Sequence, residues 1–362
     1  MPRPNATSRF ATALPPAPPG RPTGNAVRRT PLHEQTVVIT GASSGIGRQT
    51  AAHFGHFGAR VVLAARNPEA LAVAAREVED AGGTALAVPT DVSDWEQVAA
   101  LADAAEREFG RIDTWVNNAG VALYGTIAQV TPEEIRRVIE VNLLGEMYGT
   151  KAAFTHMRPY GEGVIINVSS ALARRSVPLQ SAYCAAKHGV SGFSESVRLE
   201  LKRHHPGISL VEIMPASINT PLFAHARSRL GAMPMPIPPI YEPEMVARAI
   251  VRAAERPPRE AVAGRSARLL LNGQTLSARL VDRYLLFAGK GERDQHSRRP
   301  DDGTDNLFAP SAGPGSTHGD WNDGAPNGTA TTRLAVSRPA RTAALAAAVM
   351  GGGALLLRRG RH

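Results

Sequence analysis

The chain has 362 residues, a formal net charge of +9 and one cysteine. More than half of the excess charge lies in residues 1–30, which hold five arginines and no acidic residue, so the rest of the chain is close to neutral. Because the sequence has no basic stripe interleaved with aromatic residues, it argues against nucleic-acid binding. The single cysteine excludes a disulfide framework and a multi-cysteine metal site, and we expect no metal.

Residues 1–30 are predicted to be a disordered lead. They contain a proline and glycine cluster at 15–20 and show no apolar periodicity. No apolar stretch follows the basic start, so the segment does not resemble a signal peptide. The folded part is predicted to span residues 31–288.

Within residues 31–288, short apolar runs alternate with segments of helical period. The predicted strands are 36–40, 60–64, 84–89, 114–117, 163–168 and 209–214. The predicted helices are 47–57, 68–81, 94–109, 132–156 and 182–204. Because the strand runs are continuously apolar, they suit a parallel sheet covered on both faces. The pattern predicts an α/β fold, doubly wound in the Rossmann manner, with a ligand at the carboxyl ends of the strands.

A glycine-rich turn follows the first predicted strand. Residues 40–47 read T-G-A-S-S-G-I-G and lead into a helix. Gly41 would allow a tight turn, Gly45 a close approach of phosphates, and Gly47 close packing of helix on strand. Backbone N–H groups and the helix N-terminus would then bind a pyrophosphate. The spacing lacks the G-K-[ST] ending of a P-loop, which argues against a nucleotide triphosphatase.

The end of the second predicted strand indicates which dinucleotide is bound. An NAD-specific site would carry an acid here for the ribose 2′-OH, but the chain has Ala65 followed by Arg66. A guanidinium can pair with a 2′-phosphate, so NADP(H) is favoured over NAD(H). The alternative is an exposed arginine in a turn.

Tyr183 and Lys187 form a Y-x-x-x-K pentad on the predicted helix 182–204. Residues four apart share a helix face, so the ammonium can lie beside the phenol. A neighbouring cation lowers a phenol pKa toward the range of an acid/base catalyst. The pentad and the glycine turn together predict an oxidoreductase.

Five motifs in order resemble the short-chain dehydrogenase/reductase family over about residues 34–256. They are T-G-A-S-S-G-I-G at Thr40, D-V at Asp91, N-N-A-G at Asn117, V-N at Val141 with V-S-S at Val168, and Y-C-A-A-K at Tyr183. The chain is similar to the single-domain branch of roughly 250 residues, and to a bacterial subgroup with an extended C-terminal tail. The resemblance implies a small-molecule carbonyl or alcohol substrate and a homodimer or homotetramer.

The resemblance also implies roles for individual residues. Tyr183 would be the acid/base, Lys187 would lower its pKa and bind the nicotinamide ribose, Ser170 would orient the substrate oxygen, and Asn142 would hold a water in a proton relay. A satisfied buried amide is the alternative for Asn142, and a turn role is the alternative for Asp91. The implied cofactor-binding residues are Gly41, Ser43, Ser44, Gly45, Ile46, Gly47, Arg66, Asp91, Val92, Asn118, Ala119, Gly120, Tyr183, Lys187, Pro215, Ile218 and Thr220.

Residues 221–243 are predicted to form a substrate lid. They combine apolar side chains with five prolines before Glu242, which favours a hydrophobic alcohol or ketone, although the same side chains could simply pack the loop onto the body. Arg227 and Arg229, within the same segment, leave open an acidic substrate group that they would bind. A non-catalytic NADP(H)-binding sensor or interaction module on the same fold is the alternative function.

Beyond the folded part, residues 289–340 are polar and predicted to be a low-complexity linker. Residues 341–362 hold an uncharged apolar segment, 342–357, with arginines on both sides. Sixteen residues reach only about 24 Å as a helix, short of a ~30 Å hydrocarbon core. The segment is a candidate membrane anchor for a catalytic body in the cytoplasm, and the alternative is an apolar helix that docks on the body or a partner.

Overall fold

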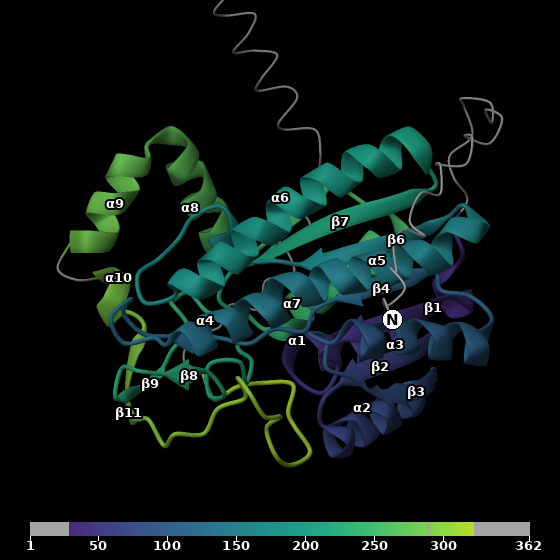
Figure 1. The fold of residues 1–362 in the computed structure, drawn as a ribbon, viewed down its shortest axis with the longest axis horizontal. Coiled ribbons are helices and arrows are strands. Elements are labelled where there is room, and N and C mark those ends of the chain that lie inside the picture. The colour runs from purple at the N-terminus through teal and green to yellow at the C-terminus, as the bar shows by residue number, and fades with distance from the viewer. Residues whose placement is uncertain (1–28, 288–289, 322–362) are drawn as a thin grey trace, which may run out of the picture.

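A computed structural model describes residues 29–287 and 290–321. A seven-stranded parallel sheet lies at its centre, in the order β10-β7-β6-β4-β1-β2-β3 (Figure 1). Its strands are β1 (Thr36–Thr40), β2 (Arg60–Ala65), β3 (Thr84–Pro89), β4 (Thr114–Asn117), β6 (Gly163–Val168), β7 (Ile208–Pro215) and β10 (Glu260–Ala263). The strand order reverses between β1 and β4, the position where an open parallel sheet has a crevice at its carboxyl edge.

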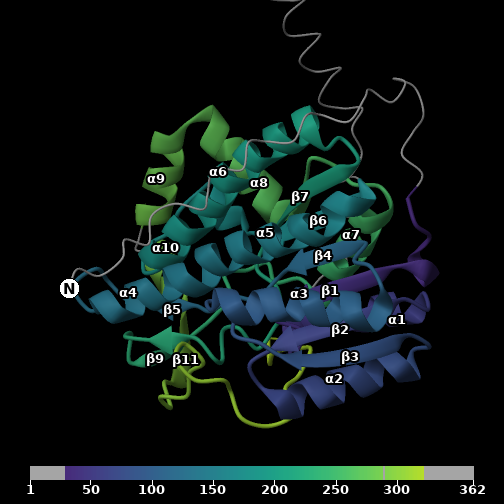
Figure 2. The same ribbon diagram turned by 45° about the vertical axis from the view of Figure 1, so that its right-hand side comes forward.

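Helices cover both faces of the sheet (Figures 1 and 2). One face packs against α1 (Gly45–His56), α2 (Pro68–Asp80) and α7 (Pro243–Glu255), and the other against α3 (Trp95–Phe109), α4 (Pro132–Ile139), α5 (Gly145–Met157) and α6 (Ser181–His204). In β1, Val37 and Ile39 enter the first core cluster and Val38 enters the second. A continuously apolar strand is therefore needed, because successive side chains point to opposite, equally buried faces.

The predicted doubly wound α/β fold is confirmed. Strands β1, β3, β4 and β6 have the predicted bounds, and β2 and β7 are one or two residues longer. The sequence interpretation missed β10, which pairs with β7 through residues such as Val262 and Met214. At four residues, β10 is too short to show a period of its own.

The segment predicted as one helix, 132–156, is interrupted. A π-helical turn, η2 (Glu140–Leu144), separates α4 from α5 and contains Asn142. Helix α4 begins with a capping box, in which Thr131 and Glu134 satisfy each other's backbone N–H groups. The poor helix former Asn142 thus lies at the irregularity.

Several smaller elements complete the described fold. They are β5 (Leu123–Tyr124), β8 (Arg227–Ser228), β9 (Ala232–Pro234), α8 (Arg265–Leu276), α9 (Ala278–Leu286), α10 (Lys290–Arg293), β11 (His296–Pro300), and the 3-10 turns η1 (Leu32–Glu34), η3 (Arg158–Tyr160) and η4 (Ala171–Ala173). Strands β8 and β9 lie in the predicted lid, where β8 pairs with β5 and β9 with β11.

The C-terminal interval differs from the predicted linker. Residues 290–321 lie on the body, and β11 pairs with β9. At the other end of the chain, Arg29 donates hydrogen bonds to the Gly163 and Gly207 carbonyls, so this residue of the predicted lead is docked. Residues 1–28 and the candidate anchor 342–357 lie outside the described residues.

Among residues 29–287 and 290–321, no helix combines the length and apolar character needed to cross a membrane.

Candidate active site

The glycine turn between β1 and α1 brings backbone close to the carboxyl edge of the sheet. Gly41 and Gly45 have φ of 66° and 52°, in the left-handed region that favours glycine. A Cβ on Gly47 would lie 2.2 Å from the Gly41 carbonyl oxygen. Asn118, after β4, donates from Nδ2 to the Thr40 carbonyl at 3.0 Å. The turn is therefore held against β4, with the start of α1 facing the crevice.

A cavity of about 760 Å³ extends from this turn to Tyr183. It is lined by most of the predicted site residues: Gly41, Ser43, Ser44, Gly45, Ile46, Arg66, Asp91, Val92, Asn118, Ala119, Gly120, Ser170, Tyr183, Lys187, Pro215, Ile218 and Thr220. Gly47 and Asn142 are not part of its lining, since Gly47 packs on the turn and Asn142 lies behind the loop after β4. The volume is in the range of small-molecule and cofactor sites.

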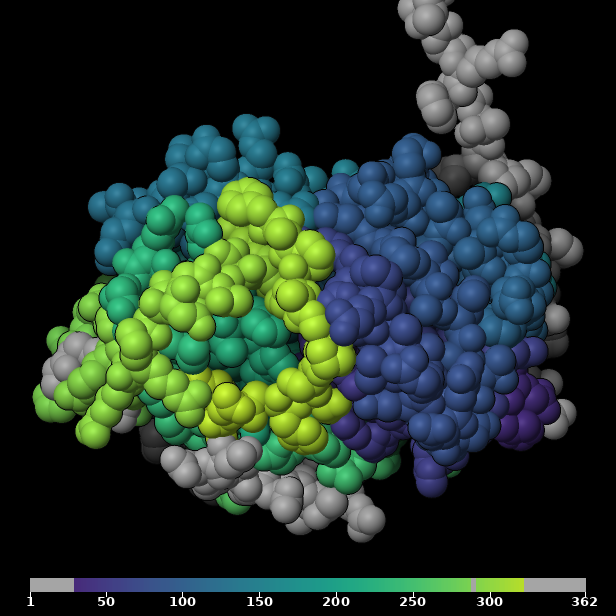
Figure 3. Space-filling model, turned by 90° about the horizontal axis from the view of Figure 1, so that it is seen from below, coloured from purple at the N-terminus to yellow at the C-terminus, as the bar shows by residue number. Residues whose placement is uncertain are grey.

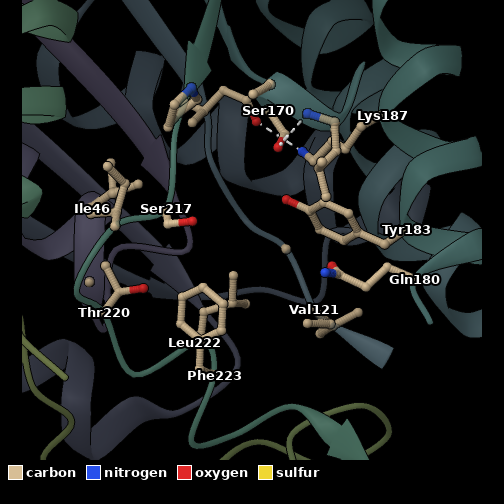
Figure 4. A pocket seen from close by; sticks show the side chains of 18 of the residues that line it. Ile46, Val121, Ser170, Gln180, Tyr183, Lys187, Ser217, Thr220, Leu222 and Phe223 are labelled. Atoms are coloured by element: carbon tan, nitrogen blue, oxygen red, sulfur yellow. Dashed lines mark hydrogen bonds between the residues drawn. The ribbon is translucent and has the colours of Figure 1, made fainter. Parts of the chain in front are cut away.

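Tyr183, Lys187 and Ser170 meet at one end of this cavity (Figure 4). Helix α6 carries Tyr183 and Lys187, and Ser170 follows β6 and caps η4, its Oγ accepting from the Leu172 N–H at 3.1 Å. The Tyr183 hydroxyl points into the cavity, and Leu222 and Phe223 of the lid lie opposite. Two separate elements therefore bring two hydroxyl groups and an ammonium to one place.

The phenol pKa of Tyr183 is raised, not lowered as the pentad predicted. Burial raises it and outweighs the opposing effects of the Lys187 charge and of a hydrogen bond with Ser170. The Lys187 charge lowers the pKa of Tyr183, as predicted, but the ammonium also donates hydrogen bonds to other groups. It donates to Glu146 Oε1 at 2.6 Å and to the Val168 carbonyl at 2.9 Å.

Glu146 is a charged residue beside this site that the sequence interpretation missed. Its side chain is buried on α5, and its second oxygen, Oε2, has no hydrogen-bond partner among the described residues. Burial raises the pKa of Glu146 to about 7, against the lowering influence of Lys187. Burial lowers the pKa of Lys187, but the charges of Glu146 and Tyr183 together outweigh this effect, so the pKa of Lys187 is raised. The carboxylate thereby favours a charged Lys187.

The ionisation of Glu146 predicts a pH dependence of stability. Its pKa of about 7 in the folded protein exceeds the ordinary 4.5, so between these values the folded chain binds more protons than the unfolded chain. The stabilisation of the folded state by this extra proton on Glu146 is complete below the ordinary pKa and is lost as pH rises to about 7. Urea titrations across this window should show the free energy of unfolding falling more steeply in the wild type than in Glu146→Gln. Parallel profiles would contradict this assignment.

Asn142 fastens the π-helical turn to the loop after β4. Its side-chain oxygen accepts from the Val121 N–H and its Nδ2 donates to the Val121 carbonyl, both at 2.8 Å. The side chain is buried and both of its polar atoms are hydrogen-bonded, as the buried-amide alternative describes. It thus holds in place the loop that leads from Asn118 to Val121.

Arg66 and Asp91 line the cavity after β2 and β3, on the other side of β1 and β4 from β6 and Ser170. Arg66 donates to the Asn306 carbonyl at 2.5 Å and the Phe308 carbonyl at 3.2 Å. Asp91 is paired with Arg137 at 2.7 Å and accepts from Ser93, so it has a turn role as well as a place in the lining. Burial raises the pKa of Asp91, but Arg137 and Ser93 together bring it below its ordinary value.

The part of the cavity next to Tyr183 includes residues that the sequence did not reveal. Gln180 lines it and donates to Gln295 at 2.6 Å. Arg227 and Arg229, the candidate partners of an acidic substrate group, pair with Glu134 at 3.0 and 2.5 Å. Further apolar lining comes from the lid and from α8 and α9, namely Leu222, Phe223, Met235, Ile237, Leu269, Leu270, Leu276, Leu280, Val281 and Leu285.

Comparison with known proteins agrees with this geometry. A sequence model of the family described as short chain dehydrogenase matches residues 35–231. The uncharacterized oxidoreductase YxnA of Bacillus subtilis is 39% identical over 321 residues, which cover 88% of this chain and 90% of that protein. Because the match covers 88% of the chain, it includes β10 and extends into residues 301–321 even if it starts at the first residue.

Two solved structures are similar in fold. A short chain dehydrogenase/reductase from Burkholderia phymatum, in complex with NAD, has 27% identity and a TM-score of 0.62 over 68% of this chain and 95% of its own. A metagenomic short-chain oxidoreductase, in complex with NADP, has 33% identity and a TM-score of 0.54 over 63% of this chain and 93% of its own. The chain therefore belongs to the short-chain dehydrogenase/reductase family of oxidoreductases.

Proposed function

We propose that the protein is an NADP(H)-dependent oxidoreductase that interconverts an alcohol and a carbonyl group on a hydrophobic substrate. One observation carries the proposal: Tyr183, Ser170 and Lys187 line one end of a cavity whose other end is a glycine turn at a helix N-terminus. The turn fits a dinucleotide, because its glycines carry no side chain toward the cavity and α1 starts at Gly45, where the backbone N–H already holds a carbonyl oxygen of Ser316. Relatives solved with NAD or NADP support the same cofactor class.

In this proposal the cofactor, when bound, supplies or accepts a hydride. Tyr183 transfers the proton of the substrate oxygen, giving it up in reduction and taking it in oxidation. Ser170 orients that oxygen by a hydrogen bond. Lys187, held charged by Glu146 at 2.6 Å, favours the phenolate and binds the ribose. Asn142 fixes the loop beside the site and supports a proton relay that starts at Lys187.

The preference for NADP(H) is assigned to Arg66. Its guanidinium lines the cavity, and its planar fork can bind a 2′-phosphate while keeping hydrogen bonds to main-chain carbonyls. We expect NADPH to bind at least tenfold more tightly than NADH, about 1.4 kcal/mol, and Arg66→Ala to remove most of that difference. Calorimetric titration with both cofactors measures it. Arg76→Ala, which removes an exposed arginine of α2, is the charge-matched control and should leave the ratio unchanged.

The hydrophobic substrate class is supported by the apolar lining from the lid, α8 and α9. The alternative is a sensor or interaction module that binds NADP(H) without turnover. A spectrophotometric hydride-transfer assay with ketones of increasing apolar size, and with sugars for comparison, separates the two. Turnover should rise with apolar size, whereas cofactor binding with no turnover of any ketone would favour the sensor.

A further inference from the structure

Residues 301–321, called the strap below, cross the edge of the sheet at which the cavity opens. Figure 3 shows this yellow-green segment between the blue atoms of the N-terminal half and the green atoms that follow β7. Asn306, Pro310, Ser311, Ala312 and Gly315 are part of the cavity lining. The strap therefore forms a wall of the cavity in which we place the cofactor.

On one side, the strap is hydrogen-bonded to the turns that begin α1 and α2. Ser316 presents its carbonyl oxygen to the Gly45 N–H at 3.0 Å. Arg48, on α1, donates to the Pro314 carbonyl at 2.8 Å. The side chain of Asn67, the N-cap of α2, donates to the Ser311 and Gly313 carbonyls at 2.7 and 2.9 Å.

On the other side, the strap is fastened to α4 and to the lid. Arg137 donates to the Leu307 carbonyl at 3.0 Å while it pairs with Asp91. Asp305 pairs with Arg227 at 2.5 Å. The Asn306 N–H donates to the His225 carbonyl at 3.0 Å. Together with the contacts to α1 and α2, these contacts link the two sides of the cavity, α1 and α2 on one side and α4 and the lid on the other.

Leu307 anchors the strap. Its side chain is fully buried and belongs to the core cluster that contains Val92 and Val141, both beside the cavity. Asp305 Oδ1 accepts from the Leu307 N–H at 2.9 Å and so sets the turn that points Leu307 inward. The next residue, Phe308, is about half exposed, which makes it a natural comparison.

We propose that the strap is a gate on the cofactor site, which must detach at Leu307 before a bound dinucleotide can leave. This inference rests on the proposed cofactor function. The strap bridges a cavity of about 760 Å³, which leaves room for a ligand beside it. Two groups assigned to the cofactor, the Gly45 N–H and the Arg66 guanidinium, already hold the strap through its carbonyls. The proposed cofactor site and the gate thus use the same two hydrogen-bonding groups, those of Gly45 and Arg66.

The gate predicts cofactor kinetics that a purely structural tail would not show. In stopped-flow displacement of NADPH by excess NADP⁺, Leu307→Ala in the full chain should release NADPH at least tenfold faster than wild type. Loss of a buried leucine side chain weakens its docking strongly. Asp305→Ala removes the Arg227 pair and the Leu307 turn without opening a core cavity, and should act in the same direction. NADH release should accelerate too, because the gate acts on either dinucleotide.

Phe308→Ala is the matched control, because it truncates an exposed side chain of the same strap, and it should change release by less than twofold. If Leu307→Ala does not fold, as judged by circular dichroism, Asp305→Ala decides the question. Unchanged release in a folded anchor variant, or a lower equilibrium Kd for NADPH in it, would overturn the gate, the latter by showing that the strap competes with the cofactor. Failure of the wild type to bind NADPH or NADH at all would instead contradict the proposed function.

Discussion

Tyr183→Phe should reduce kcat by roughly 100-fold to 10,000-fold while NADPH affinity stays within about twofold of wild type. The change removes the transferable proton and leaves the ring in place on α6. Because Tyr183 lies on α6 and Arg66 follows β2, the proposed adenosine contacts are not altered. Steady-state kinetics on the best ketone from the panel and a fluorescence titration with NADPH measure the two quantities.

Tyr148→Phe is a suitable control, since the same atom is removed from a tyrosine of α5 that packs edge-on against Trp95 and is not part of the cavity lining. It should retain nearly full activity. If Tyr183→Phe kept more than about a tenth of kcat, Tyr183 would not be the acid/base. Loss of NADPH binding in Tyr183→Phe would point to a folding defect.

Lys187→Ala is expected to impair both turnover and cofactor binding, because one ammonium is assigned to the phenol and to the ribose. We expect a fall in kcat of at least about 100-fold and a Kd for NADPH raised at least tenfold. Equal NADPH affinity in wild type and variant would remove the ribose role of Lys187. The same variant should also lose stability, since it leaves the Glu146 carboxylate buried without its partner.

The double variant Lys187→Ala/Glu146→Gln separates these two effects. Breaking a buried ion pair by removing one partner costs about 3–5 kcal/mol, and much of that cost reflects the uncompensated charge. At pH 8, urea unfolding should therefore show the double variant to be more stable than Lys187→Ala. Its turnover should remain as low as that of Lys187→Ala. Recovery of turnover together with stability would mean that Lys187 acts only by holding the fold.

Much of the fold could be predicted from local patterns. The apolar run of β1, the glycines after it and the four-residue spacing of Tyr183 and Lys187 each report on a neighbourhood of a few residues. Such short-range patterns follow directly from helix and strand geometry. They identified six of the seven strands of the sheet, and placed Tyr183 and Lys187 on one helix.

The environment of those residues was decided by tertiary structure. Glu146 lies 41 positions from Lys187, and only the packing of α5 against α6 buries the two together. Burial of the Tyr183 phenol, which no local spacing reveals either, is why the pKa of Tyr183 is raised where the pentad alone predicted lowering.

The strap is the clearest difference between the sequence prediction and the structure. Its composition resembles a linker, and Arg66 reaches its Asn306 carbonyl across 240 positions. Most of its contacts to the rim of the cavity use backbone carbonyls, which every residue possesses. The sequence alone thus determined six strands of the sheet, the glycine turn and the pentad, because these depend on side-chain type and spacing. Only the tertiary structure placed Glu146 and the strap, because buried charge pairs and main-chain acceptors leave no local pattern to recognise.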